Sequence, residues 1–401
     1  MKKLIFWSAL SVLLFAGCKK DEVANCQVEV IKIAGLFSET GGLSNWGLTS
    51  EAAIQIAIDR INDDFESQGV LYRFELTSYD TQLDPAKAVL AMNSIAASGC
   101  KLVIGPQTSS ELLAIKSFAD SLGILVVSPT STSASLAIPN DMVFRFSPGQ
   151  TILAAAMSQS YINQGKQALI MIARNDAGST GLQTALASHF TNAGGVVIEA
   201  GFFNGSDTDF STVLAEVKTQ ILNLSSTYSN AQIGVVTSSF DETTLIFNQA
   251  ASDPILSTVN WFGGVGFFKN QALMNDPIAA QFAVNTQFYS PGFSLPLSEQ
   301  NVWEPLLANI YSTTGIQGAA ATMCAYDIMS VFGKMVRDYN TVPSNAEAKQ
   351  SAFQASANSF LGATGLITLD ANGDRSNGVF DFWGLQNNNG TYEWVFVGQS
   401  E

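Results

Sequence analysis

The sequence predicts an α/β protein of two Rossmann-like lobes with parallel sheets, joined by a multi-strand hinge. Short apolar runs alternate with helical patterns along the chain, as in residues 101–136, where two such runs flank one amphipathic helix. The same alternation begins again after residue 149, which indicates a second lobe. A chain of 401 residues that is 47% hydrophobic and 13% charged is typical of such a two-lobe protein.

Acidic residues outnumber basic ones, and the formal net charge is −15. So acidic a surface argues against nucleic acid as a partner. We expect no cofactor, because the sequence carries neither a dinucleotide-binding glycine pattern nor a metal-ligand pattern.

The N-terminus has the pattern of a secretory signal peptide, with Lys2 and Lys3 before a short apolar run that ends at Gly17. The end of this run resembles the lipobox of bacterial lipoproteins, with Cys18 as the acylated residue. We therefore expect a lipoprotein signal peptide at 1–17, a lipidated tether at 18–26, and membrane attachment through the lipid only. The alternative is a secreted protein that is cut elsewhere.

The first lobe is predicted from residue 27 to 147. Helix 86–98 follows Asp84, which we interpret as a helix cap because Pro85 occupies the first turn. The other elements expected in this lobe are strand 27–37, helix 48–62, strand 72–79, strand 101–104, the helix after Thr108 and strand 124–127.

Hydroxyl residues follow both apolar runs of the stretch 101–136. Thr108, Ser109 and Ser110 open its helix, and the segment 128–133 follows the second strand. The carboxyl ends of parallel strands meet at one edge of a sheet, where open α/β sheets bind ligands. Free N–H groups at the helix start would suit an anion there. Trp46, in a Gly/Ser loop at the same edge, is either a wall of the crevice or an ordinary packing residue.

Cysteines near two neighbouring strands suggest a disulfide. Cys26 precedes the first strand and Cys100 precedes strand 101–104. In the strand order 2-1-3-4-5 these strands are adjacent and parallel, so we expect a Cys26–Cys100 disulfide, with two unpaired thiols as the alternative. Cys324, within an apolar helix, is expected to be a buried small hydrophobe.

The second lobe is predicted from residue 148 to 289. Its expected strands are 168–173, 195–203, 231–236 and 259–262, and its expected helices are 152–163, 182–193, 210–224 and 243–251. Segments 142–149 and 283–293 are expected to be extended crossovers between the lobes. Helices at 302–313, 319–339 and 346–360 then return to the first lobe (about 290–365), and the strands of the tail (about 366–401) join the second.

These stretches together resemble a type I periplasmic binding protein of the branched-chain amino acid group, from about residue 28 to 397. The matching segments are IAGLFSETGGLSNWG, YDTQLDPAKAV, VIGPQTSSELLA, ILVVSPTSTSASL, FRFSPG, IARNDAGSTGL, TDFSTVLAEVK and WFGGVGF. The resemblance implies a small-molecule ligand held between the lobes by hinge closure. It also implies the membrane subunits of an ABC importer as partner, and we expect a monomer.

The resemblance also implies site residues in the first lobe. Ser109 and Ser110 fall where the family binds a ligand carboxylate, and Thr130 and Thr132, on either side of Ser131, fall where it binds the α-ammonium. Trp46 falls at the aromatic residue that packs over the ligand.

The second lobe departs from the family pattern at three positions. Gly178, in the loop after Asp176, stands where a tyrosine is usual in the family. Ser239, next to Phe240, stands where an aromatic residue is common. Val265 stands where the family usually has an acid that neutralises the ligand ammonium. Leaving an ammonium without its counter-charge in a closed cleft costs on the order of 3–5 kcal/mol. Either Asp176, Asp241 or Glu242 supplies the charge, or the ligand is a carboxylate or amide without an amine.

Rival functions are a hydrolase, a lipid-anchored ligand sensor and an interaction protein with a diverged cleft. An enzyme is disfavoured because the sequence has a single histidine, His189, placed within helix 182–193, and no nucleophile elbow. The motif 370–374 imitates part of a calcium loop, but we interpret it as a hairpin turn. The sequence therefore favours a binding protein outside the cytoplasm that captures an amino acid or a related carboxylate or amide for import.

Overall fold

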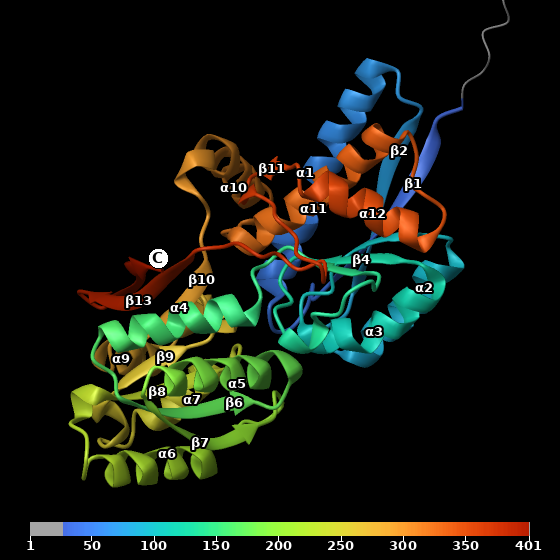
Figure 1. Cartoon of the computed structure of the whole chain (residues 1–401). Coiled ribbons are helices and arrows are strands. Elements are labelled where there is room, and N and C mark those ends of the chain that lie inside the picture. The colour runs from blue at the N-terminus through green and yellow to red at the C-terminus, as the bar shows by residue number, and fades with distance from the viewer. Residues whose placement is uncertain (1–26, 401) are drawn as a thin grey trace, which may run out of the picture.

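The computed structural model describes residues 27–400. The predicted signal peptide, the tether, Cys18 and Cys26 lie outside this range. Within it the chain forms two α/β lobes connected by several segments of chain (Figure 1). The predicted fold class is therefore confirmed.

The first lobe, lobe I, is built on a five-stranded parallel sheet with the predicted order β2-β1-β3-β4-β5. Helices from the N-terminal part and from residues 300–357 both cover this sheet (Figure 1). The elements of lobe I are β1 (Glu29–Phe37), α1 (Ser44–Gln68), β2 (Tyr72–Asp80), α2 (Pro85–Ala97), β3 (Leu102–Ile104), α3 (Ser109–Leu122), β4 (Leu125–Ser128), β5 (Val143–Arg145), α10 (Gln300–Thr314), α11 (Ala320–Tyr339), α12 (Ala346–Ala357), β11 (Leu361–Gly362) and β12 (Gly365–Leu366).

The second lobe, lobe II, has a seven-stranded sheet of order β14-β13-β10-β9-β8-β6-β7. Strands β6 to β10 are parallel, and β13 and β14 join antiparallel at one end. The elements of lobe II are α4 (Gln150–Asn163), β6 (Ala168–Arg174), α5 (Ala177–Asn192), β7 (Val196–Phe203), α6 (Ser211–Leu224), β8 (Ile233–Ser238), α7 (Glu242–Ala250), β9 (Asn260–Gly263), α8 (Gln271–Asn275), α9 (Pro277–Asn285), β10 (Tyr289–Phe293), β13 (Phe380–Asn388) and β14 (Thr391–Gln399).

The chain passes between the lobes three times. The first crossing follows β5, the second follows β10, and the third precedes β13 (Figure 1). The third crossing lies after the position of about 365 expected from the sequence. Ile367 and Leu369 are buried in the lobe I core, and Asp374 pairs with Arg145 of β5, so the chain stays with lobe I for about ten residues more.

Two helices begin or end where the sequence analysis did not expect it. Trp46 lies in the first turn of α1 rather than in a loop, because Leu43 adopts a left-handed conformation (φ 59°) that starts the helix at Ser44. Residues 283–285 belong to α9 instead of an extended crossover. The Asp276 side chain caps that helix by accepting hydrogen bonds from the N–H groups of Ile278 and Ala279.

The two cysteines within the described range are buried. Cys100 forms no disulfide within residues 27–400, and its thiol donates to the carbonyl oxygen of Lys32 at 3.2 Å. Because Cys26 lies outside the described range, its pairing with Cys100 stays a prediction. Cys324 is fully buried in the lobe I core, as predicted, and burial raises the pKa of its thiol to about 12.

Between residues 27 and 400, the helices are all too short or too polar to span a lipid bilayer.

Candidate functional site: a cavity between the lobes

The two lobes touch through hydrogen bonds beside the carboxyl ends of their strands. The hydroxyl of Ser110 in α3 accepts from the N–H of Ala177 in α5 at 3.3 Å. The amide of Gln150, at the start of α4, donates to the carbonyl oxygen of Gly178 at 2.5 Å, and its oxygen accepts from the N–H of Ala134 at 3.2 Å. These contacts hold the cleft between the lobes closed.

A cavity of about 60 Å³ remains between the lobes at this closed edge. It is large enough for a group the size of a carboxylate, and both lobes contribute to its walls. The side chains around it are mostly hydroxyl-bearing or apolar, and Asp176 is the one ionisable residue among those that line it within the described chain. The lining residues are Leu43, Trp46, Gln107, Thr108, Ser109, Thr130, Thr132, Gln150, Asp176, Gly178, Ser179, Leu182, Ser238, Ser239, Phe240, Gly264, Val265 and Gly266.

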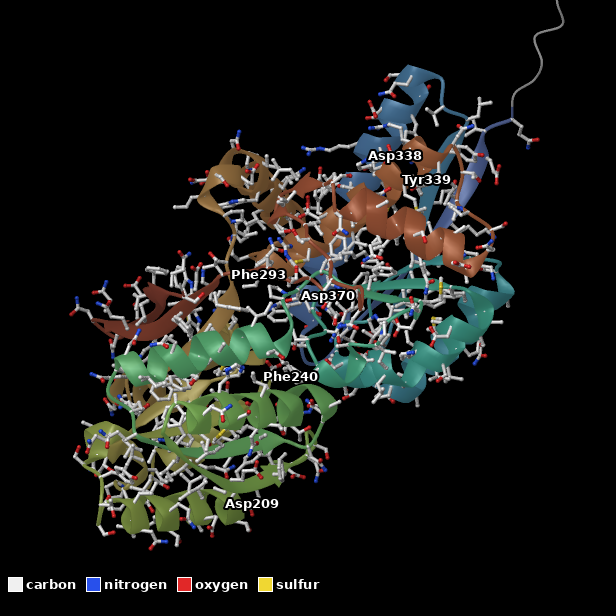
Figure 2. The ribbon with its side chains drawn as sticks, in the orientation of Figure 1. Asp209, Phe240, Phe293, Asp338, Tyr339 and Asp370 are labelled. Carbon is white, nitrogen blue, oxygen red and sulfur yellow. The ribbon has the colours of Figure 1, made fainter. Side chains whose placement is uncertain are left out.

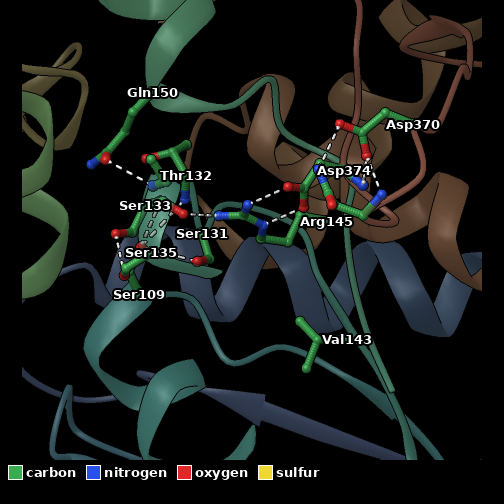
Figure 3. Close-up of polar contacts among 12 residues, drawn as sticks. Ser109, Ser131, Thr132, Ser133, Ser135, Val143, Arg145, Gln150, Asp370 and Asp374 are labelled. Atoms are coloured by element: carbon green, nitrogen blue, oxygen red, sulfur yellow. Dashed lines mark hydrogen bonds and ion pairs between the residues drawn. The ribbon is translucent and has the colours of Figure 1, made fainter. Parts of the chain in front are cut away.

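The hydroxyl loops after β3 and β4 are tied to one another, as Figure 3 shows. The hydroxyl groups of Ser109 and Ser131 are hydrogen-bonded at 2.9 Å, and Ser109 Oγ also accepts from the N–H groups of Thr132 and Ser133. Thr130 Oγ1 donates to the carbonyl oxygen of Gln107 at 2.6 Å. The hydroxyl groups of Ser109 and Ser131 are therefore already hydrogen-bonded within the protein, and they hold the two loops in shape.

The N-terminus of α3 points into the cleft. Thr108 and Glu111 form a capping box, in which Thr108 Oγ1 accepts from the N–H of Glu111 while the Glu111 carboxylate accepts from the N–H of Thr108. The N–H groups of Ser109 and Ser110, in the first turn, have no acceptor within the helix. Together with the helix dipole they favour an anion or a carbonyl oxygen at this end.

One arginine of lobe II pairs with two acids that could face a ligand. Arg174 pairs with Asp176 at 2.9 Å and with Glu242 at 2.8 Å. Asp176 also caps α5 by accepting from the N–H of Ser179. Burial raises the pKa of Glu242, and Arg174 opposes that rise. Both carboxylates are thus engaged with the guanidinium, which offsets one of their two negative charges and would have to be displaced before either could pair directly with a ligand ammonium.

Asp241 does not face this cavity. Its carboxylate accepts a hydrogen bond from Asn270 at 2.5 Å, and it lines a separate, larger pocket beside the cavity. Phe240, which Figure 2 labels at the junction of the lobes, lines the cavity itself, and the guanidinium of Arg174 stacks 5.0 Å from its ring centre.

The three residues of lobe II that depart from the family pattern contribute no charge to the cavity. Val265 lines the cavity wall with an apolar side chain, and Ser239 is buried, with its hydroxyl bonded to those of Thr237 and Thr243. Gly178 lies so close to lobe I that a Cβ added to it would be 3.8 Å from Ser109 Oγ. The structure therefore brings most of the predicted residues to one cavity, with Ser110 and Ser131 behind its wall and Asp241 outside it.

Two polar residues that the sequence analysis missed line the same cavity with unpaired groups. Gln107 is 3% exposed, and its oxygen accepts from the N–H of Ser38, which fixes the amide nitrogen as the group without a partner among the described residues. Ser238 is 2% exposed, and its hydroxyl likewise has no partner there. An unpaired buried polar group costs about 1–3 kcal/mol, so a ligand group that pairs with it would be favoured. The signal available in the sequence was their position at or near the carboxyl ends of strands, since Ser238 ends β8 and Gln107 lies three residues after β3.

The fold and the cavity define a two-lobed α/β protein of the type I periplasmic binding protein architecture. Residues 30–378 match the family model described as periplasmic binding protein, and the chain belongs to this family, a class whose members bind solutes.

Three similar proteins illustrate the range of this fold. An uncharacterised protein of Methanocaldococcus jannaschii is 24% identical over 308 residues, which is 73% of this chain and 72% of that protein. The leucine-binding protein LivK of Thermotoga maritima superposes with a TM-score of 0.71 at 22% identity, covering 92% of this chain and 98% of that one. A solute-binding protein of an ABC transporter from R. palustris, solved in complex with benzoate, superposes with a TM-score of 0.70 at 15% identity. The match covers 92% of this chain and 96% of that one.

Proposed function

We propose that this protein is an extracytoplasmic solute-binding protein that captures a small organic acid or amide without an α-amine. The ligand binds in the cavity between the lobes, and the lobes close over it by hinge motion. One observation carries the proposal: a closed interlobe cavity is lined by buried polar groups of both lobes, Gln107 Nε2 and Ser238 Oγ, that the described chain leaves unpaired.

The donors in the cavity favour an acceptor group on the ligand. The amide nitrogen of Gln107 and the first N–H groups of α3 donate towards the same space. A carboxylate or amide oxygen accepts several such hydrogen bonds, and charge-assisted ones are the stronger kind. In this proposal Ser109 and Ser110 act through their backbone N–H groups, while Thr130, Ser131 and Thr132 hold the loop in place.

The charges in the cavity disfavour an α-ammonium. Asp176 and Glu242 are already paired with Arg174, and Val265 adds an apolar surface where a counter-charge would be needed. Solved structures of similar fold include a leucine-binding protein and a complex with benzoate, an acid that has no amine. The electrostatics of this cavity favour an acid without an amine, as benzoate is.

Delivery to the membrane subunits of an ABC importer is the role we infer for the loaded protein, with the chain acting as a monomer. We further propose that Cys18 carries the lipid anchor and that residues 18–26 hold the lobes off the membrane. Replacement of Cys18 by Ser is expected to release the protein from the membrane and to abolish incorporation of a labelled fatty acid. Unchanged labelling in that variant would contradict the anchor.

Isothermal titration calorimetry of the purified protein with monocarboxylates, amides and α-amino acids tests the binding role. We expect one-to-one binding of at least one acid or amide and weaker binding of the α-amino acid of the same carbon skeleton. If no compound of the three classes binds, the cleft is not a small-acid site and the proposal fails.

A further inference from the structure

A second and larger pocket adjoins the cavity on the far side of Trp46. It has a volume of about 440 Å³ and is bounded by both lobes and by the crossing segment after β10. It shares the residues Leu43, Trp46 and Gly266 with the cavity. A small gap of about 30 Å³, lined by Thr130 and Val265 on one side and by aromatic residues on the other, continues from one to the other.

The cavity is too small to enclose more than the end of a ligand. At about 60 Å³ it accommodates a carboxylate-sized group, so the remainder of a longer molecule has to extend past Trp46. The outer pocket presents aromatic surface in that direction, since Trp303, Trp383, Phe268 and Phe293 all line it. Phe293, at the end of β10, is labelled in Figure 2 at the crossing between the lobes.

Two hydrogen-bond donors in the outer pocket lack acceptors. Lys269 Nζ lies 3.3 Å from the ring centre of Trp383, and no hydrogen bond or ion pair among residues 27–400 involves it. The indole nitrogen of Trp383 is buried and also has no acceptor among these residues. Desolvation lowers the pKa of Lys269, although Asp381 partly opposes this. An anion placed here would meet an ammonium and an indole N–H at once.

The acids of the outer pocket, in contrast, already have donors. Asp241 accepts from Asn270 at 2.5 Å, and Asp381 accepts from Gln399 at 2.8 Å. Each carboxylate keeps its negative charge but has a hydrogen-bond donor, whereas Lys269 Nζ and the indole N–H of Trp383 have no acceptor among the described residues.

We propose that the outer pocket is a second subsite that binds the distal carboxylate of an elongated diacid with an apolar or aromatic middle. Lys269 and the indole N–H of Trp383 recognise that carboxylate, while the first carboxylate occupies the cavity near Gln107. The aromatic walls cover the middle of the molecule. This inference rests on the proposed function and specifies the ligand class of the same cleft.

Calorimetric titration with matched pairs of acids tests the subsite. The probes are octanoate against octanedioate, and biphenyl-4-carboxylate against biphenyl-4,4′-dicarboxylate. We expect each diacid to bind with a stoichiometry of one and roughly 10-fold to 100-fold more tightly than its monoacid, the range of one charge-assisted hydrogen bond. In Lys269→Met the diacid should fall to the affinity of the monoacid. Trp383→Phe, which keeps a ring and removes the N–H, should reduce the gain several-fold.

Lys87→Met is the matched control, because it removes the same charge from an exposed position on α2 that lines neither pocket, and it should retain the full gain. Equal affinities for monoacid and diacid in the native protein would overturn the subsite while leaving the proposed function intact. The subsite would also be overturned if 8-aminooctanoate bound most tightly and lost this affinity in Asp241→Asn. That result would mean that Asp241 binds a ligand ammonium in the outer pocket. Absence of binding by every acid would overturn this inference, and the proposed function would then stand or fall with the titrations of amides.

Discussion

Arg145 and Asp374 form a buried, two-pronged ion pair that links residues 229 positions apart. Arg145 Nε donates to Asp374 Oδ1 and Nη2 donates to Oδ2, both at 2.5 Å, as Figure 3 shows. A third nitrogen of Arg145 donates to the carbonyl oxygen of Ser133, in the loop that also carries the site hydroxyls. One side chain thus joins the first and third crossings to the loop that forms the cavity.

Loss of either partner of this pair is expected to destabilise the protein strongly. Asp374→Asn leaves a guanidinium that is 2% exposed without its counter-charge, and a cost of about 3–5 kcal/mol follows. Urea-induced unfolding measures the change. Arg73→Met is the control. Arg73 pairs with Glu75, and both side chains are 55% exposed, so this substitution should change the free energy of unfolding by less than about 1 kcal/mol. Equal effects of the two substitutions would contradict the structural role of the buried pair.

Asp327 makes stability depend on pH in the acidic range. It accepts hydrogen bonds from the N–H groups of Ala363 and Thr364 and from the Thr364 hydroxyl. Desolvation outweighs these bonds and raises its pKa from 3.8 to about 6. Since the folded protein holds this proton more tightly than the unfolded chain, the contribution of Asp327 is most favourable below pH 4 and is lost as the pH rises through 6.

The size of this loss follows from the shift in pKa. A rise of about two pKa units corresponds to about 3 kcal/mol. We expect the free energy of unfolding of Asp327→Asn to fall less steeply between pH 4 and 6 than that of the native protein. Other buried acids titrate in both proteins, so the difference between the two slopes is the quantity to measure. Parallel slopes would show that Asp327 does not titrate in this window.

Gln107→Glu is expected to weaken the binding of acids at least 100-fold. The new side chain keeps an oxygen for the N–H of Ser38 but replaces the donor in the cavity by a carboxylate that repels the ligand. Binding of a neutral amide should weaken less. Gln68→Glu adds the same charge at the exposed end of α1 and should leave affinity unchanged. If Gln107→Glu binds acids normally, the amide nitrogen does not contact the ligand.

Gly178→Leu is expected to prevent full closure of the lobes. A Cβ at this position would lie 3.3 Å from Asp176 and 3.8 Å from Ser109 Oγ of the opposite lobe, so the rest of a leucine side chain has no space in the closed form. Ligand affinity should fall more than roughly 10-fold. Small-angle X-ray scattering should show that the radius of gyration no longer contracts when ligand is added.

Ser188→Leu is the matched control for closure, because it adds the same side chain to an exposed position of α5. Normal contraction and affinity in this variant would show that the effect of Gly178→Leu comes from the cleft. Normal contraction in Gly178→Leu itself would contradict the closed arrangement described above.

Most of the fold could be predicted because apolar runs and helical patterns alternate clearly. The strand order of lobe I and the capping role of Asp84, which accepts from the N–H of Ala86, are confirmed. His189 lies on α5, in the helix predicted there, and is half-buried. The start of α1 was missed because Leu43 begins the helix without a capping side chain, and α9 was missed although Asp276 before a proline is a usual helix start.

The site could be predicted only in part from the sequence. Hydroxyl loops at strand ends pointed to the cavity, and they line it. The sequence left three acids open as counter-charges, and only the structure distinguishes them, because Arg174 reaches Glu242 across 68 positions of sequence. Whether a group such as Gln107 Nε2 or Lys269 Nζ has a partner depends on which distant segments fold beside it, and no local pattern reports that.

The most direct measurement compares two acids that differ only in the α-amine. Thermal unfolding of the purified protein is followed with octanoate and with 2-aminooctanoate, and with 3-phenylpropanoate and phenylalanine as a second pair. A ligand at one hundred times its dissociation constant stabilises the fold by about 2.7 kcal/mol, which raises the melting temperature by a few degrees. Stabilisation by the amine-free member of a pair, with little or none from its amino acid, is the predicted result. Greater stabilisation by the amino acid would contradict the account, since it would require Asp176 or Glu242, both paired with Arg174, to serve as the counter-charge.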